Sequence, residues 1–293
     1  MVVARIHHLL RRFIPEPTLN RAGSYVRHGP GDLFDRLTRR TDPLIPPRRK
    51  DFTGGAFFRE TGDEFVAYFH EYGQIEPHHR ILEIGSGIGR MARPLTSFLD
   101  PIKGRYEGFD IDVGGVLWCL EHYVSYPNFH FQRANIYNKF YNPSGPVQAD
   151  AFTFPYSDAS FDFAFATSVF THMPLPAVAR YLQETARVLT PGARALVTVF
   201  MWNRESEKAV AQGKSSQGYM QTARKALPFR PFGDLIVADP DVPEFAIALP
   251  QERWDEAVHE AGLEQVGDVL WGNWCGRTNF TSYQDIVILR KPG

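Results

Sequence analysis

The sequence has little of what secreted, metal-binding or membrane-spanning proteins need. It contains two cysteines among 293 residues, Cys119 and Cys275, and these two form neither a disulfide framework nor a metal-binding spacing. No apolar run approaches the roughly 20 residues of a membrane-spanning helix. The formal net charge is −1, which gives no reason to expect a nucleic-acid partner. We therefore expect a cytoplasmic protein without a transmembrane segment.

The composition is that of a globular protein, with 43% hydrophobic and 22% charged residues. Charge is concentrated at the start, because residues 1–50 hold eleven Arg or Lys and four acids. Apolar residues within 1–14 recur at helical spacing, and we expect this basic amphipathic segment to dock on the protein rather than on a membrane. It lacks the apolar core and small-residue cleavage site of a signal peptide. The predicted organisation is a basic extension or lid over 1–50, followed by one domain over 51–293.

A glycine turn is the most informative motif of the chain. An apolar strand over 80–84 runs into Gly85, Gly87 and Gly89, with Glu83 two residues before the first glycine. Glycine tolerates unusual backbone angles and lets a ligand lie against the main chain. A turn of this kind between a parallel strand and a helix holds nucleotide-like ligands. The spacing differs from the Gly-x-Gly-x-x-Gly of dinucleotide-binding proteins.

Further strands follow at the spacing of a doubly wound sheet. Asp110 ends the second of them and lies 21 residues beyond Gly89, where a carboxylate can accept hydrogen bonds from ribose hydroxyls. The later strands are predicted over 128–133, 161–166, 194–201, 264–271 and 281–289. The last two are close enough to pair as an antiparallel hairpin, whereas a dinucleotide-binding fold would add another parallel crossover. Two segments, 136–157 and 202–250, are longer than ordinary loops and are predicted to be insertions.

The pattern Glu-x-Gly-x-Gly-x-Gly resembles the first motif of the class I S-adenosylmethionine (SAM) dependent methyltransferases. Residues 160–162, 168–173 and 187–192 are similar to the motifs that follow the cofactor-binding region in that class. The resemblance implies an α/β, Rossmann-like fold, in which parallel strands end in an antiparallel hairpin and helices cover both faces. It also implies SAM as cofactor and S-adenosylhomocysteine as product.

The resemblance carries roles over to particular residues. Glu83 would hold the methionine ammonium, Asp110 the ribose hydroxyls, and Ile111 the adenine face. Asn135 stands where relatives usually have an aspartate that accepts from the adenine amino group, and Thr167 would touch the methionine end. The predicted cofactor-binding residues are Glu83, Gly85, Ser86, Gly87, Gly89, Arg90, Asp110, Ile111, Asn135 and Thr167.

His172 is the candidate catalytic residue, because it follows the fourth strand where the methyl group would be transferred. An acceptor hydroxyl has a pKa far above neutrality, so a nearby base would assist its methylation, and histidine titrates in the right range. The alternative is that His172 only packs the loop or bonds a backbone carbonyl.

The C-terminal hairpin and the N-terminal extension supply the candidate acceptor-binding residues. Trp271, Trp274 and Arg277 surround a glycine-rich turn, and their aromatic faces and polar groups suit a small molecule such as a sugar. The alternative is that the tryptophans close the core. Tyr25 and His28 are candidates for a lid.

A second resemblance concerns the acceptor. Short stretches including 107–110, 137–143, 154–156 and 274–277 are similar to bacterial methyltransferases associated with glycan biosynthesis. This implies O-methylation of a saccharide hydroxyl; the alternative acceptors are a lipid, a quinone or another small metabolite. A binding protein that keeps the cofactor pocket without turnover and a NAD-dependent oxidoreductase are further alternatives. The sequence shows no metal-ligand spacing and so does not indicate Mg²⁺, although it does not exclude this ion. It does not exclude a homo-oligomer either.

Overall fold

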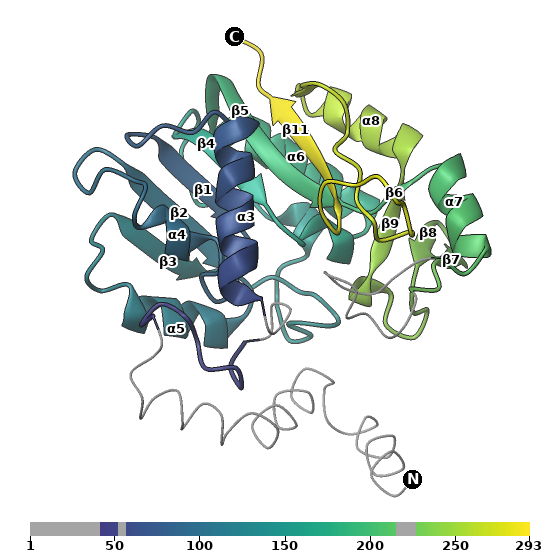
Figure 1. The fold of residues 1–293 in the computed structure, drawn as a ribbon, viewed down its shortest axis with the longest axis horizontal. Coiled ribbons are helices and arrows are strands. Elements are labelled where there is room, and N and C mark those ends of the chain that lie inside the picture. Colours follow the sequence, from purple (N-terminus) through teal and green to yellow (C-terminus); the bar gives the residue numbers. More distant parts are fainter. Residues whose placement is uncertain (1–41, 52–56, 215–226) are drawn as a thin grey trace, which may run out of the picture.

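A seven-stranded sheet forms the centre of the computed structural model, which describes residues 42–51, 57–214 and 227–293 (Figure 1). The strand order is β10-β11-β5-β4-β1-β2-β3. The strands are β1 (Arg80–Ile84), β2 (Arg105–Asp110), β3 (Phe129–Arg133), β4 (Phe161–Ala166), β5 (Leu189–Val199), β10 (Glu264–Gln265) and β11 (Asp285–Arg290). Strands β1 to β5 pair in parallel, whereas β11 is antiparallel to both β5 and β10. The predicted parallel sheet with an antiparallel C-terminal hairpin is confirmed.

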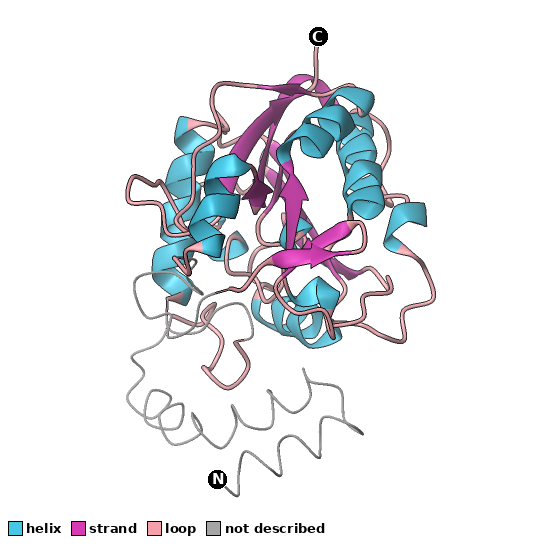
Figure 2. Ribbon diagram, turned by 90° about the vertical axis from the view of Figure 1, so that its right-hand side faces the viewer, coloured by secondary structure: helices cyan, strands magenta, loops and turns pink. Residues whose placement is uncertain are grey.

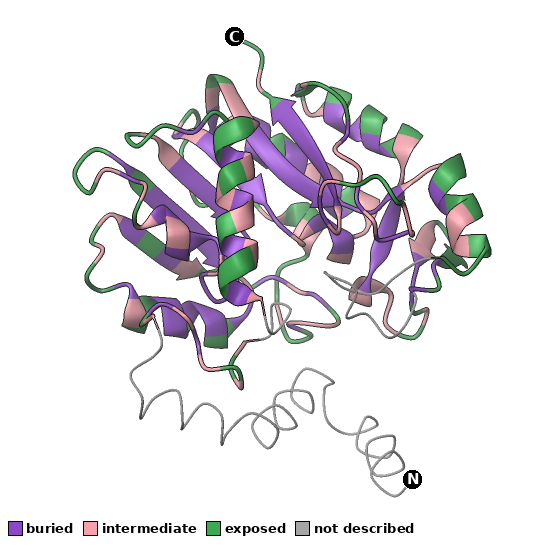
Figure 3. Cartoon of the chain, in the orientation of Figure 1, coloured by how far each residue is buried: buried purple, intermediate pink, exposed green. Residues whose placement is uncertain are grey.

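Helices cover both faces of this sheet, as Figure 2 shows. One face carries α3 (Phe58–Glu71), α4 (Ala92–Leu95) and α5 (Val113–His122), and the other carries α6 (Leu175–Val188) and α8 (Gln251–Glu260). The central strands read as apolar runs because both of their faces are buried (Figure 3).

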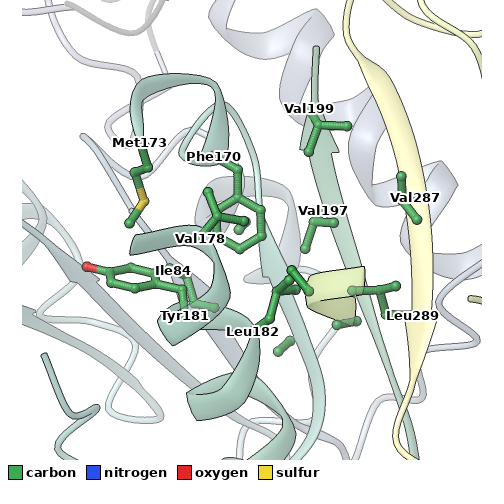
Figure 4. Close-up of a cluster of buried hydrophobic side chains, with 14 of the residues drawn as sticks. Ile84, Phe170, Met173, Val178, Tyr181, Leu182, Val197, Val199, Val287 and Leu289 are labelled. Atoms are coloured by element: carbon green, nitrogen blue, oxygen red, sulfur yellow. The ribbon is translucent and has the colours of Figure 1, made fainter. Parts of the chain in front are cut away.

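Two hydrophobic clusters fill the space between the sheet and its helices. Under α6 and α8, strand residues such as Val197 and Leu289 pack against Val178 and Leu182 (Figure 4). On the opposite face, α3 contributes Phe69, whose ring centroid lies 4.3 Å from that of Phe165 on β4. Burial of side chains of this size contributes about 1.5–3 kcal/mol each.

The start of the described chain packs against the same body. Leu44 is buried in the cluster under α3, α4 and α5. Asp42 lies 3.5 Å from both Arg59 and Arg93. The proposed boundary between an extension and a domain near residue 50 stays a prediction.

The longer predicted insertion contains a second sheet. Its strand order is β6-β9-β8-β7, and the strands are β6 (Met201–Trp202), β7 (Arg230–Phe232), β8 (Leu235–Val237) and β9 (Ile247–Pro250). Helix α7 (Arg204–Ala211) and the 3-10 turn η3 (Pro243–Phe245) complete it. The shorter insertion contains η1 (Ala149–Ala151), and η2 (Phe170–His172) follows β4.

Three predicted strand boundaries were wrong. The fifth strand spans Leu189–Val199 rather than 194–201, because α6 passes directly into β5, whose pairing shifts register at a bulge opposite Phe161–Phe163. The strand predicted over 264–271 is only Glu264–Gln265, after which an isolated bridge joins Leu270 to Ile286. The strand predicted over 281–289 begins four residues later, at Asp285.

Candidate active site

A cavity of about 330 Å³ opens at the carboxyl ends of the parallel strands. Its lining comes from the ends of β1, β2 and β4, from the shorter insertion and from η2 and α6. Eight of the ten predicted cofactor-binding residues line it, together with the predicted base His172. The predicted residues that line the cavity are Glu83, Gly85, Ser86, Gly87, Arg90, Asp110, Ile111, Thr167 and His172.

The glycine turn forms one wall of the cavity and is built as the sequence predicts. Gly85 has φ 78° and Gly87 has φ 55°, in the left-handed region that favours glycine. A Cβ atom on Gly85 would lie 2.3 Å from Cγ2 of Val169, so the turn also needs glycine for close packing. Gly89 does not line the cavity; a Cβ there would lie 2.9 Å from the Tyr123 hydroxyl. Its role in the structure is to let α5 pack closely.

Asp110 ties the end of β2 to the glycine turn. Its Oδ2 accepts a hydrogen bond from the Gly87 N–H at 2.7 Å, and its Oδ1 accepts from the Asp112 N–H at 2.6 Å. Burial raises the pKa of this carboxyl to about 6, although both backbone donors oppose the shift. Each carboxylate oxygen keeps a second lone pair that can accept from a ligand hydroxyl.

Glu83 and Arg90 place buried charge beside the turn. The Tyr106 hydroxyl donates to Oε2 of Glu83. Burial raises the pKa of Glu83 well above its usual range, and the Asp110 charge adds to the effect. Burial lowers the pKa of Arg90, while the charges of Asp51, Glu83 and Glu64 oppose that shift. A cationic ligand group beside Glu83 would stabilise its ionised form.

Ser86 supports the presence of a polar ligand. Its side chain is buried and lines the cavity, and its Oγ has no hydrogen-bond partner within the described part of the protein. Buried polar groups normally have a partner, so a bound molecule would fit here by supplying one.

His172 lines the cavity and is held by the longer insertion. Its Nδ1 lies 2.9 Å from the backbone oxygen of Glu244 in η3. A carbonyl only accepts, so Nδ1 carries the proton, and Nε2 of the neutral ring carries the lone pair. Burial lowers the pKa of His172. The ring is therefore mainly neutral at neutral pH, which is the state a general base needs.

Residues that the sequence did not single out complete the cavity. Tyr141 lies edge-on to His172, with ring centroids 5.3 Å apart. Asn138 donates from Nδ2 to the His172 backbone oxygen at 3.3 Å and accepts from the Tyr141 N–H at 2.9 Å. Tyr106 does not line the cavity, but its hydroxyl donates to Glu83, which does. The segment that holds Asn138 and Tyr141 was predicted as part of the insertion over 136–157, but no site role was expected for either residue.

Asn135 does not line the cavity. It is exposed, and its Oδ1 accepts from Arg133 at 3.0 Å and from Asn142 at 3.1 Å. The structure therefore does not bring it to the other predicted cofactor-binding residues.

Trp274 lies in the core and not at the cavity, which favours the alternative that this tryptophan closes the core; its acceptor role stays a prediction. Its side chain is fully buried, and its Nε1 donates to Oδ2 of Asp285 at 2.6 Å. Arg277 is also buried; it lies 3.1 Å from Asp285 and stacks 4.5 Å from the centroid of the half-buried Trp271. None of these side chains lines the cavity. Trp274 belongs to the core of the second sheet, whereas Trp271 packs against the cluster under α6 and α8. Tyr25 and His28 lie outside the described residues.

Two structural findings concern metals and membranes. Across 42–51, 57–214 and 227–293, no group of three or more His, Cys, Asp or Glu side chains is arranged to hold a metal ion. Within the same ranges, no helix has the length and apolarity needed to cross a membrane.

The fold is the Rossmann-like α/β fold of the class I SAM-dependent methyltransferases. Residues 82–197 match the family model described as a methyltransferase domain. A SAM-dependent methyltransferase from Aquifex aeolicus has the same fold, with TM-score 0.50 and 15% identity over 86% of this chain and 99% of that chain. The CurJ carbon methyltransferase aligns with TM-score 0.50 and 15% identity over 99% of this chain and 71% of its own.

Curated relatives match part of the chain. Squalestatin hexaketide synthase of Phoma sp. is 25% identical over 241 residues, which are 80% of this chain and 8% of that protein. Phthiotriol/phenolphthiotriol dimycocerosates methyltransferase 1 of Mycobacterium ulcerans is 31% identical over 41% of this chain and 36% of its own length. Sterol methyltransferase-like 3 of Botryococcus braunii is 31% identical over 41% of this chain and 26% of its own. The chain thus spans well under two thirds of these relatives.

Proposed function

We propose that this protein transfers a methyl group from SAM to a small organic acceptor. The observation that carries the proposal is the meeting of the glycine turn, Glu83, Asp110 and His172 around one cavity. When bound, SAM supplies a methyl group activated by its positively charged sulfur. The protein's contribution is then to align the partners and exclude water.

The cofactor roles follow from the donors and acceptors at the cavity wall. Asp110 would accept from the ribose hydroxyls, since its oxygens keep free lone pairs. Glu83 would accept from the methionine ammonium, whose charge favours the ionised carboxylate. Ile111 and the backbone of Gly85 and Gly87 would lie against the bound molecule.

His172 would act as general base towards the acceptor. The Glu244 carbonyl keeps the proton on Nδ1, which leaves Nε2 able to take a proton from the acceptor. This role suits an acceptor whose nucleophilic atom carries a proton at neutral pH, such as a hydroxyl.

The acceptor is proposed to be a lipid, a quinone or another small metabolite with an apolar part. Val169, Met173 and Tyr181 give the cavity apolar walls. The names of the curated relatives refer to hexaketide, sterol and phthiotriol compounds. O-methylation of a saccharide hydroxyl stays a prediction that rests on the sequence resemblance. Trp274, one of the two tryptophans expected to offer a face to a sugar, is buried and lends it no support.

The experiment is a radiolabel screen with methyl-labelled SAM. Sterols, quinones and fatty acyl compounds form one panel, and mono- and disaccharides form the other. Labelled product from the first panel alone supports the proposed acceptor class. Labelled product from sugars alone would replace it with the saccharide prediction.

A further inference from the structure

Ser168 has a backbone conformation that L-residues rarely adopt. It directly follows β4 and Thr167, lines the cavity and has φ 58°. Strained residues of this kind persist where their surroundings hold them, and they cluster at ligand-binding sites.

Two side chains from neighbouring strands hold Ser168 in place. The Ser168 N–H donates to Oγ1 of Thr198 on β5 at 2.7 Å. Thr198 Oγ1 donates to Oε1 of Gln284 at 2.5 Å, and Gln284 Nε2 donates to Oγ of Ser168 at 2.9 Å. These three contacts form a closed ring of hydrogen bonds, in which Gln284 lies directly before β11.

The direction of the hydrogen bonds in this ring follows from the distances. A separation of 2.5 Å is within the range of O–H···O bonds but shorter than N–H···O bonds. The Gln284 oxygen therefore faces Thr198, and its amide nitrogen faces Ser168. Because Ser168 Oγ accepts from Gln284, its own proton stays available to donate to another acceptor.

Ser168 lies close to the glycine turn. Strands β4 and β1 are paired in parallel, with Phe165 opposite Glu83. Val169, the next residue, is the side chain that a Cβ on Gly85 would meet at 2.3 Å. The available donor of Ser168 is thus on the same side of the cavity as Glu83, which would take the ammonium of the cofactor's amino-acid portion.

We infer that Ser168 binds the carboxylate of the cofactor's amino-acid portion, and that Thr198 and Gln284 are positioning residues for it. The inference rests on the proposed function, because it requires SAM or S-adenosylhomocysteine in the cavity. A carboxylate is a suitable partner for the Ser168 hydroxyl, since it only accepts and forms strong charge-assisted hydrogen bonds.

The test compares two ligands by calorimetry. S-adenosylhomocysteine carries the amino-acid portion, whereas 5′-methylthioadenosine shares the adenosine and sulfur but lacks it. Ser168→Gly removes the hydroxyl at a position whose φ suits glycine, so the fold should be retained. We expect about tenfold weaker binding of S-adenosylhomocysteine and less than about twofold change for 5′-methylthioadenosine.

Variants of the two positioning residues extend the test. Thr198→Val and Gln284→Met should give the same selective loss, and Thr198→Ser should restore the affinity because it keeps the hydroxyl. Equal weakening of both ligands by Ser168→Gly, or unchanged binding of S-adenosylhomocysteine, would overturn the inference. If the wild-type protein binds neither ligand, the proposed function itself fails.

Discussion

At the scale of single residues, the Asp110 carboxylate stabilises the fold and keeps lone pairs that a ligand can use. Its two hydrogen bonds from Gly87 and Asp112 connect the glycine turn to the segment that begins α5. Burial raises its pKa to about 6, and the backbone hydrogen bonds from Gly87 and Asp112 oppose that shift. The ionised form is the one that can accept from ribose hydroxyls through all of its lone pairs.

Binding of S-adenosylhomocysteine is predicted to weaken as the pH falls through about 6. The folded-state pKa of Asp110 is raised from its usual 3.8, so the carboxyl gains a proton below about pH 6 while the protein is still folded. Protonation removes acceptor capacity, and affinity should fall by up to about tenfold per pH unit. Calorimetry between pH 7.5 and 5 measures this.

Asp110→Asn is the matched variant for this prediction. This variant should bind S-adenosylhomocysteine more weakly at pH 7.5 and lose most of the pH dependence of that affinity. Any pH dependence that remains is attributed to Glu83. If the variant kept the full pH dependence of the wild type, Asp110 would not be the titrating group.

His172→Ala is predicted to reduce turnover far more than cofactor binding. Loss of a general base typically lowers the rate about 10²–10⁴-fold. The rate is measured with the acceptor found by the radiolabel screen, and affinity for S-adenosylhomocysteine is measured in parallel. His259→Ala, on the exposed face of α8, is the control and should keep the wild-type rate. A wild-type rate in His172→Ala would return the residue to a packing role.

At the scale of elements, the second sheet supports one side of the cavity. Its 3-10 turn supplies the Glu244 carbonyl that holds His172. Asp285 of β11 links it to the main sheet, because its Oδ2 accepts from the Met201 N–H at 2.8 Å and from Trp274. Burial raises the pKa of Asp285 to about 6, against the opposing effect of these donors and Arg277.

Trp274→Ala is predicted to destabilise the fold without changing cofactor affinity. Removing a fully buried tryptophan typically costs about 3–5 kcal/mol, since it leaves a cavity and here also removes one of the hydrogen bonds that Asp285 accepts. Chemical denaturation measures the loss. Trp271→Ala is the comparison, because this ring is half-buried and its stacking with Arg277 contributes about 1 kcal/mol. Equal losses in the two variants would argue against this account of the core.

The main sheet could be predicted from sequence because its central strands are mostly apolar runs bounded by turns. Phe161–Ala166 is such a run. The second sheet could not be predicted, since its strands Arg230–Phe232 and Leu235–Val237 are too short to show an alternation of apolar and polar residues. Its pairing of Met201 with Leu249 also joins residues far apart in the chain.

At the scale of the whole molecule, the topology assembles the cavity from distant segments. Parallel strands end at one edge of the sheet, so Glu83, Asp110 and Thr167 could be predicted to meet there. The hydrogen bond from Tyr106 to Glu83 could not be predicted, because it depends on the direction in which each side chain points. The burial of Trp274 likewise depends on a sheet that the sequence did not reveal.

The central claim is that the cavity binds SAM and its product, and a thermal-shift titration tests it most directly. A ligand that binds only the folded state at 100 times its dissociation constant stabilises it by about 2.7 kcal/mol. We predict that S-adenosylhomocysteine raises the Tm by several degrees in a concentration-dependent way and that NAD does not. No shift with either SAM or S-adenosylhomocysteine, or a shift with NAD alone, would contradict the claim.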